Sequence, residues 1–145
     1  MKTRVFLLGL LLISSTVFAN LPGRWSGVGH LVADNGDYQK DCQSIGLELS
    51  QSAAIFSVDA GHFECGDVSS KWEPLDLDVR GDSLYIGDEK VGDIRSNRVS
   101  FTLQDSEMNF HFAAEIFADG LHYTESWILP DTTKYLEVTG VLQPR

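Results

Sequence analysis

Residues 110–129 read FHFAAEIFADGLHYTESWIL, and their pattern indicates the fold class. Apolar and polar side chains alternate on both sides of Asp119-Gly120, a dipeptide typical of a two-residue hairpin turn. Two antiparallel strands about that turn place one face toward a core and the other toward water. We therefore predict a β-hairpin centred on Asp119-Gly120.

The inward face of this hairpin carries a single carboxylate, that of Glu125. A buried carboxylate is costly unless a partner satisfies it. Glu125 is therefore a satisfied interior acid, a ligand contact or a residue displaced to the rim, and the sequence leaves these alternatives open. The turn at 119–120 pairs Phe110 with Leu129, Phe112 with Trp127, Ala114 with Glu125 and Ile116 with Tyr123. The candidate ligand-binding residues of the interior are Glu125, Tyr123, Trp127, Phe112 and Phe110.

The same alternation extends through the rest of the chain, and no window shows a convincing helical period. Only residues 65–72 have room for a helical turn. Most connections are too short for a crossover, so neighbouring strands form antiparallel hairpins. This pattern predicts an all-β, up-and-down antiparallel barrel of about 8–10 strands, with a β-sandwich as the alternative. Further strands are expected at residues 25–31, 45–49, 56–60, 75–80, 84–86, 91–94, 99–104 and 135–142.

The N-terminus is typical of a secretory signal peptide. Lys2 and Arg4 precede an apolar run over residues 5–13, and Val17-Phe18-Ala19 offers a cleavage site. We predict a signal peptide over residues 1–19 and one domain over residues 20–145. No second apolar run follows, so we expect no membrane insertion after cleavage. The protein is then exported, to the periplasm or to the extracellular space.

The exported part is strongly acidic. Without Lys2 and Arg4, nine basic residues remain against twenty-one acidic ones, a net charge of −12. Phosphate backbones and anionic membrane surfaces repel such a protein, so nucleic acid is not an expected partner. The acids are scattered singly, which is typical of a solvated surface, although a site for cationic partners is the other reading.

The two cysteines lie in the exported part, where the compartment oxidises thiols. A hairpin centred on residues 53–54 pairs Leu47 with Ala60 and, continued outward, places Cys42 opposite Cys65. Directly opposed residues of antiparallel strands bring their Cβ atoms to about 4.5–5.5 Å, close to bridging distance. We therefore predict a Cys42–Cys65 disulfide.

A metal site formed by Cys42, His62 and Cys65 is the competing interpretation of the cysteines, but no fourth ligand is evident. We expect no metal and no cofactor. The sequence has no Gly-x-Ser-x-Gly, His-Glu-x-x-His or phosphate-binding glycine loop. It also shows no candidate catalytic nucleophile with an adjacent base. Gly27-Val28-Gly29 is interpreted as relief of crowding where a strand bends. An enzyme is not expected.

Gly23-Arg24-Trp25 opens the first expected strand shortly after the signal peptide. This Gly-x-Trp resembles the start of proteins of the calycin superfamily, which comprises lipocalins, fatty-acid-binding proteins and avidins. The resemblance implies a lipocalin-like barrel in which Trp25 closes one end of the core. It also implies that a late arginine, here Arg145, packs across Trp25 as its structural partner.

Two functions of different classes follow. The first is a carrier that binds a small, largely apolar or cationic molecule in the barrel interior, and an apolar cavity above about 300 Å³ would favour it. The second is a protein-binding or inhibitory module with a filled barrel, which contacts a protein partner through its loops. A packed interior would favour the second function.

Overall fold

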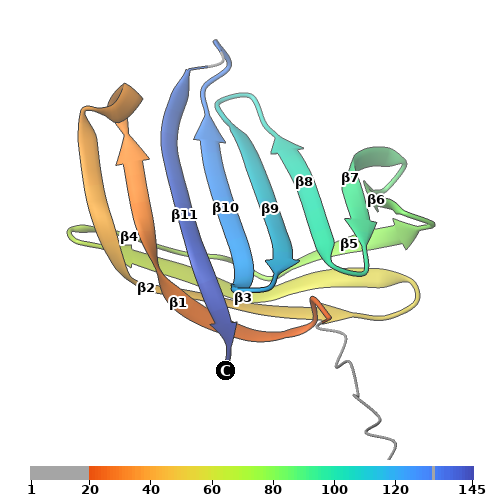
Figure 1. Cartoon of the computed structure of the whole chain (residues 1–145). Helices are drawn as coiled ribbons and strands as arrows, with labels where there is room; N and C mark the ends of the chain where they lie inside the picture. The colour runs from red at the N-terminus through yellow and green to blue at the C-terminus, as the bar shows by residue number, and fades with distance from the viewer. Residues whose placement is uncertain (1–19, 132) are drawn as a thin grey trace, which may run out of the picture.

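The computed structural model describes residues 20–131 and 133–145 of the chain (Figure 1). The predicted signal peptide, residues 1–19, lies outside the described residues. The elements are β1 (Gly23–Ala33), η1 (Asp34–Gly36), β2 (Tyr38–Gln51), β3 (Ile55–Cys65), β4 (Val68–Lys71), β5 (Leu75–Arg80), β6 (Ser83–Ile86), β7 (Glu89–Arg95), β8 (Arg98–Gln104), β9 (Asn109–Phe117), β10 (Gly120–Ile128) and β11 (Lys134–Pro144).

The strands form one antiparallel sheet whose hydrogen bonding closes on itself. The order is β2-β1-β11-β10-β9-β8-β7-β6-β5-β3, and pairing of β2 with β3 completes the ring, with β4 beside β5 on the same edge of β3. This arrangement confirms the predicted all-β, up-and-down barrel rather than the two sheets of a sandwich. The described residues form eleven strands instead of the expected 8–10. Residues 65–72, which had room for a helical turn, contribute β4 instead.

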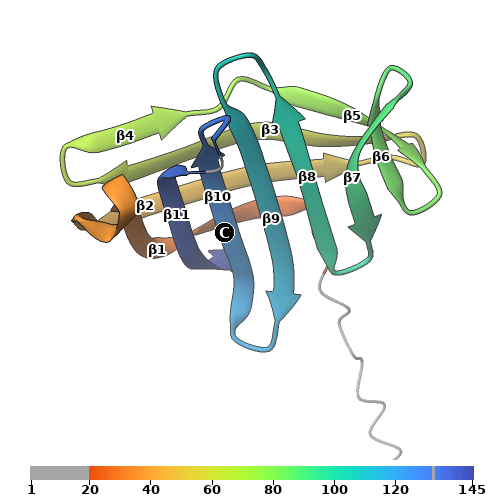
Figure 2. The ribbon, with the colours of Figure 1, turned by 90° about the horizontal axis from the view of Figure 1, so that it is seen from above.

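The barrel is flattened, and its two sides cross. Figure 2 shows β2 and β3 running at a steep angle to β8–β11 when the molecule is seen from above. Inward side chains from both sides interdigitate between them, as alternation along each strand requires. The largest apolar side chains that are essentially inaccessible to water are those of Phe56, Phe101, Phe112, Leu21, Leu31, Ile45, Leu77, Leu84, Leu121 and Leu142.

Two glycines allow β1 to bend against its neighbours. The register of β1 against β2 shifts between Gly27 and Gly29. A Cβ atom at Gly29 would collide with the carbonyl oxygen of Thr139, and one at Gly27 would collide with that of Val141. The close approach of β11 therefore requires glycine at both positions, which confirms the predicted relief of crowding.

The hairpin of β9 and β10 has the predicted faces but a different pairing. β10 already begins at Gly120, so the turn falls one residue earlier than expected. Glu125 pairs with Phe112 and Trp127 with Phe110, whereas the prediction paired Phe112 with Trp127. The predicted pairing is therefore wrong by two residues. Because side chains alternate with a period of two, this shift leaves every inward assignment unchanged.

The pairing of β2 with β3 follows the prediction near the turn and then shifts by one residue beside Glu48. As a result, Leu47 pairs with Gly61, and the predicted pairing of Leu47 with Ala60 is wrong. Ala60, which an unbroken alternation from Phe56 and Val58 would place in the core, is exposed instead. An extra residue in one strand has this effect because it reverses the alternation beyond it.

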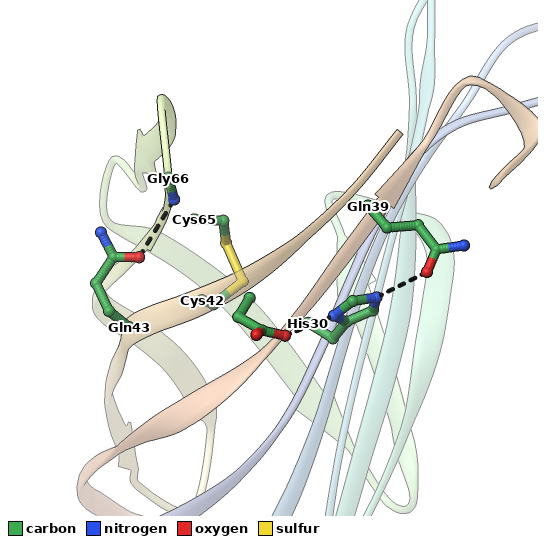
Figure 3. A network of polar contacts seen from close by, with 7 residues as sticks. His30, Gln39, Cys42, Gln43, Cys65 and Gly66 are labelled. Atoms are coloured by element: carbon green, nitrogen blue, oxygen red, sulfur yellow. Dashed lines mark hydrogen bonds and ion pairs between the residues drawn. A yellow bond between two sulfur atoms is a disulfide. The ribbon is translucent and has the colours of Figure 1, made fainter. Parts of the chain in front are cut away.

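A disulfide joins Cys42 of β2 to Cys65 of β3, as predicted (Figure 3). Between Cys42 and Ile45, β2 has one residue more than the facing part of β1. The extra residue reverses the alternation of side chains, so Cys42 and Ile45 both face the core although they are three positions apart. Next to it, the side-chain oxygen of Gln43 accepts a hydrogen bond from the backbone N–H of Gly66 at 3.2 Å. Because both sulfurs are bonded to each other, the alternative metal site is ruled out.

We expect reduction of the disulfide to lower the melting temperature clearly. The bond closes a loop across 23 positions of the sequence, which corresponds to a stabilisation of about 2–4 kcal/mol. Thermal unfolding with and without a phosphine reductant measures this, and a C42A/C65A variant serves as a control that the reductant should not affect. Equal melting temperatures for the oxidised and reduced wild type would contradict the prediction.

Trp25→Ala should destabilise the protein by about 3–5 kcal/mol, the range for truncation of a buried aromatic side chain. Trp25 is only 5% exposed, and its indole N–H donates to the carbonyl oxygen of Leu21 at 2.9 Å. Denaturant unfolding monitored by circular dichroism measures the change. Tyr135→Ala is the matched control, because Tyr135 is 51% exposed and its removal should have little effect. A loss below 1 kcal/mol for Trp25→Ala would show that the indole is peripheral.

Candidate functional site

The interior is organised by an indole that sequence reasoning missed. Trp72 lies between β4 and β5, where the chain leaves the edge of β3 and Pro74 follows two residues later. Its backbone N–H still bonds to the carbonyl oxygen of Gly61 at 2.8 Å, while its ring packs edge-on against Phe110 and Phe112 at centroid distances of 4.6 and 5.4 Å. The local signal was a tryptophan close to a proline that interrupts the alternation.

Glu125 lies at the centre of this interior and is completely buried. The indole N–H of Trp72 donates to its Oε2 at 3.0 Å, and the indole N–H of Trp127 donates to its Oε1 at 2.8 Å. The hydroxyl group of Tyr123 also donates to Oε2. Three donors from two parts of the chain therefore satisfy one carboxylate, and Glu125 is the satisfied interior acid among the alternatives left open by the sequence.

Tyr123 is held in its donating form. Burial raises the pKa of the Tyr123 phenol well above its usual value, and the nearby charge of Glu125 acts in the same direction. The phenol therefore stays protonated near neutral pH and keeps its hydrogen bond to Glu125. The ring of Tyr123 packs edge-on against Phe112 at 5.7 Å.

A hollow that borders this interior opens at one end of the barrel and has a volume of about 460 Å³. We call it the mouth pocket. It lies between the connection from β4 to β5 and the loop from β8 to β9. Of the predicted ligand-binding residues, Phe110 and Trp127 line it, whereas Glu125, Tyr123 and Phe112 lie behind its wall. The pocket is lined by Ser70, Lys71, Trp72, Glu73, Pro74, Leu75, Leu103, Gln104, Asp105, Met108, Phe110 and Trp127.

A second hollow of similar size, about 440 Å³, lies beside η1 and the start of β11. The described residues that line it include the ion pair of Lys134 with Glu137, whose charged atoms are 2.6 Å apart. That pairing, together with a hydrogen bond from Ser126, holds the pKa of the Glu137 carboxyl below its usual range. None of the described lining residues is aromatic, so the mouth pocket is better suited to an apolar ligand.

Trp25 and Arg145 lie near each other, but the expected stacking of the Arg145 guanidinium on the Trp25 ring is not among the cation–π contacts of the described residues. Arg145 is exposed, and its backbone N–H bonds to the carbonyl oxygen of Arg24 at 2.9 Å. Trp25 and Arg145 both border a hollow of about 110 Å³ on the barrel wall. Within residues 20–131 and 133–145, the cation–π contacts are those of Lys40 with Tyr38 and of Arg80 with Tyr85.

The barrel wall also carries a serine–histidine contact that the sequence did not reveal. Ser44 Oγ lies 3.0 Å from His62 Nε2 across β2 and β3, with both side chains partly buried. On the exposed side of β1 and β2, His30 lies 3.1 Å from Asp41 and 3.3 Å from Gln39, and Figure 3 shows His30 beside Gln39. In the described part of the chain, no group of three or more His, Cys, Asp or Glu residues is placed to hold a metal ion. No described helix has the length and apolar character to span a bilayer.

Comparison of the chain with protein-family models and with curated proteins gave no match.

Glu125→Gln should destabilise the fold by about 1–3 kcal/mol. The substituted amide has the same shape, but whichever way it is turned, its NH₂ group faces an indole N–H, which cannot accept a hydrogen bond. Denaturant unfolding compared with Glu89→Gln, an exposed acid on β7, measures the loss. A Glu125→Gln protein as stable as the wild type would mean that the three hydrogen bonds do not hold in solution.

Proposed function

We propose that this protein is an exported, lipocalin-like barrel that binds a small, largely apolar molecule in the mouth pocket. The observation that carries the proposal is the pocket of about 460 Å³ bordered by Trp72, Phe110 and Trp127. Sites for small molecules are typically concave, mostly apolar and 300–1,000 Å³ in volume, with a few polar groups that orient the ligand. Gln104 and Lys71 are polar groups at this pocket.

Export is the part of the proposal supported by sequence and by covalent structure together. A basic start, an apolar run and a cleavage motif occupy residues 1–19. The Cys42–Cys65 disulfide fits an oxidising compartment, either the periplasm or the extracellular space. The acidic surface disfavours nucleic acid as a partner.

A second candidate function is a protein-binding module that acts through its loops. The filled interior favours it: Trp72, Phe101 and Phe112 pack against one another behind the mouth pocket, where a carrier of a larger ligand would need space. The loop between β8 and β9, residues 105–108, lies at the rim of the pocket and would contribute to such an interface.

Met108→Lys should weaken binding of a neutral apolar probe, N-phenyl-1-naphthylamine, by at least about fivefold. The change removes apolar contact at the pocket rim and introduces a charge there, while Met108 lies in a loop and is only partly buried. Titration followed by probe fluorescence measures the affinity. Val28→Lys is the matched control, because Val28 is 64% exposed and does not line the pocket.

Wild-type protein that gives no saturable probe signal would overturn the proposed function. Equal weakening by Met108→Lys and Val28→Lys would place the probe outside the mouth pocket. Native mass spectrometry of protein from its own host supplies the second readout, since a retained small molecule would appear as a defined mass increment.

A further inference from the structure

The wall of the mouth pocket is built on a buried acidic side chain, that of Glu125. Glu125 is completely buried, and its three hydrogen-bond donors, Trp72, Tyr123 and Trp127, carry no formal charge. Among residues 20–131 and 133–145, no Lys, Arg or His forms an ion pair with it. Neutral donors satisfy the oxygens of a carboxylate without neutralising an ionised form, and a low dielectric screens such a charge poorly.

Two indoles connect the Glu125 carboxyl group to the pocket. Trp72 and Trp127 each donate an N–H to Glu125, and each lines the mouth pocket. A hydrogen bond from an indole N–H to an anion increases the electron density of the ring. The indole ring already gives the strongest attraction among aromatic side chains for a cation on its face. Both effects make the pocket wall attractive to a positive charge.

Charged residues at the rim of the mouth pocket also favour a cation there. Glu73 and Asp105 border the pocket together with one cation, Lys71. The backbone N–H groups of Glu107 and Met108 donate to Asp105 and hold the pKa of its carboxyl below the usual range, so it is ionised at neutral pH. The chain as a whole carries a formal charge of −10, which steers cations toward it and anions away.

We propose that the ligand of the mouth pocket is an organic cation, an ammonium group carried on an apolar body. The apolar body lies against Phe110, Leu103 and Met108, and the ammonium group lies against the indoles of Trp72 and Trp127, within the field of Glu125. This inference rests on the proposed function and adds the chemical class of the ligand to it. It also assigns Glu125 a role in selectivity that does not require contact with the ligand.

The test uses two soluble probes of equal shape: choline and its neutral isostere 3,3-dimethylbutan-1-ol. The chain has three tryptophans, so ¹⁵N-tryptophan labelling gives three indole N–H signals in NMR spectra. Titration with choline should shift the signals of Trp72 and Trp127 with saturation and leave that of Trp25, which does not line the pocket, in place. The affinity for choline should fall as salt concentration rises, and the affinity for the alcohol should not.

Glu125→Gln should weaken choline binding by at least about fivefold and change binding of the alcohol by less than about twofold. Glu89→Gln, which removes the same charge from an exposed position away from the pocket, is the matched control and should leave both affinities unchanged. The indole spectrum of each variant shows whether it is folded. If Glu125→Gln fails to fold, the wild-type comparison decides, because choline must then bind at least as tightly as the alcohol.

Binding of the alcohol without binding of choline would overturn the inference and leave the proposed function standing. Choline binding that is insensitive to both salt and Glu125→Gln would also overturn it. Failure of both probes and of N-phenyl-1-naphthylamine would overturn the inference and the proposed function together.

Discussion

The interior can pack as it does because the buried carboxylate of Glu125 finds three hydrogen-bond donors. An isolated charge in an apolar interior is strongly unfavourable, and three converging donors make it tolerable. These donors come from β10 and from the segment between β4 and β5, so the acid joins parts of the chain that lie 53 positions apart. The hydrogen bond to Glu125 fixes the indole of Trp72 in the interior, where its ring packs against Phe110 and Phe112.

The hydrogen bond between Trp72 and Glu125 also bears on where the mouth pocket lies. Trp72 enters the interior and packs against Phe110 and Phe112, so aromatic rings occupy the middle of the barrel. The remaining volume is displaced to the open end, where Trp72 becomes part of the pocket wall. One side chain therefore closes the interior and borders the mouth pocket. This explains why the features expected of a carrier and of a filled barrel occur in the same molecule.

Irregularities in the strands determine which side chains reach the interior. β2 has one step more than β1 near Cys42, and the register of β2 against β3 shifts beside Glu48. Each irregularity exchanges the inner and outer faces beyond it. Together they leave Cys42 and Cys65 adjacent and facing the core, although the residues between them do not keep the uniform register from which their pairing was predicted.

Alternation and turn residues were enough to predict the strand content, the antiparallel pairing of neighbouring strands and the inward face of the hairpin that carries Glu125. These features follow from local chemistry, because side-chain alternation and turn residues act over a few positions. A two-residue error in the β9–β10 pairing left the faces intact for the same reason. Three further features came from the three-dimensional fold: Ala60 faces outward, Trp72 turns inward, and the pocket lies at the barrel end. Those outcomes depend on bulges and on contacts between distant strands, which leave no periodic signal in the sequence.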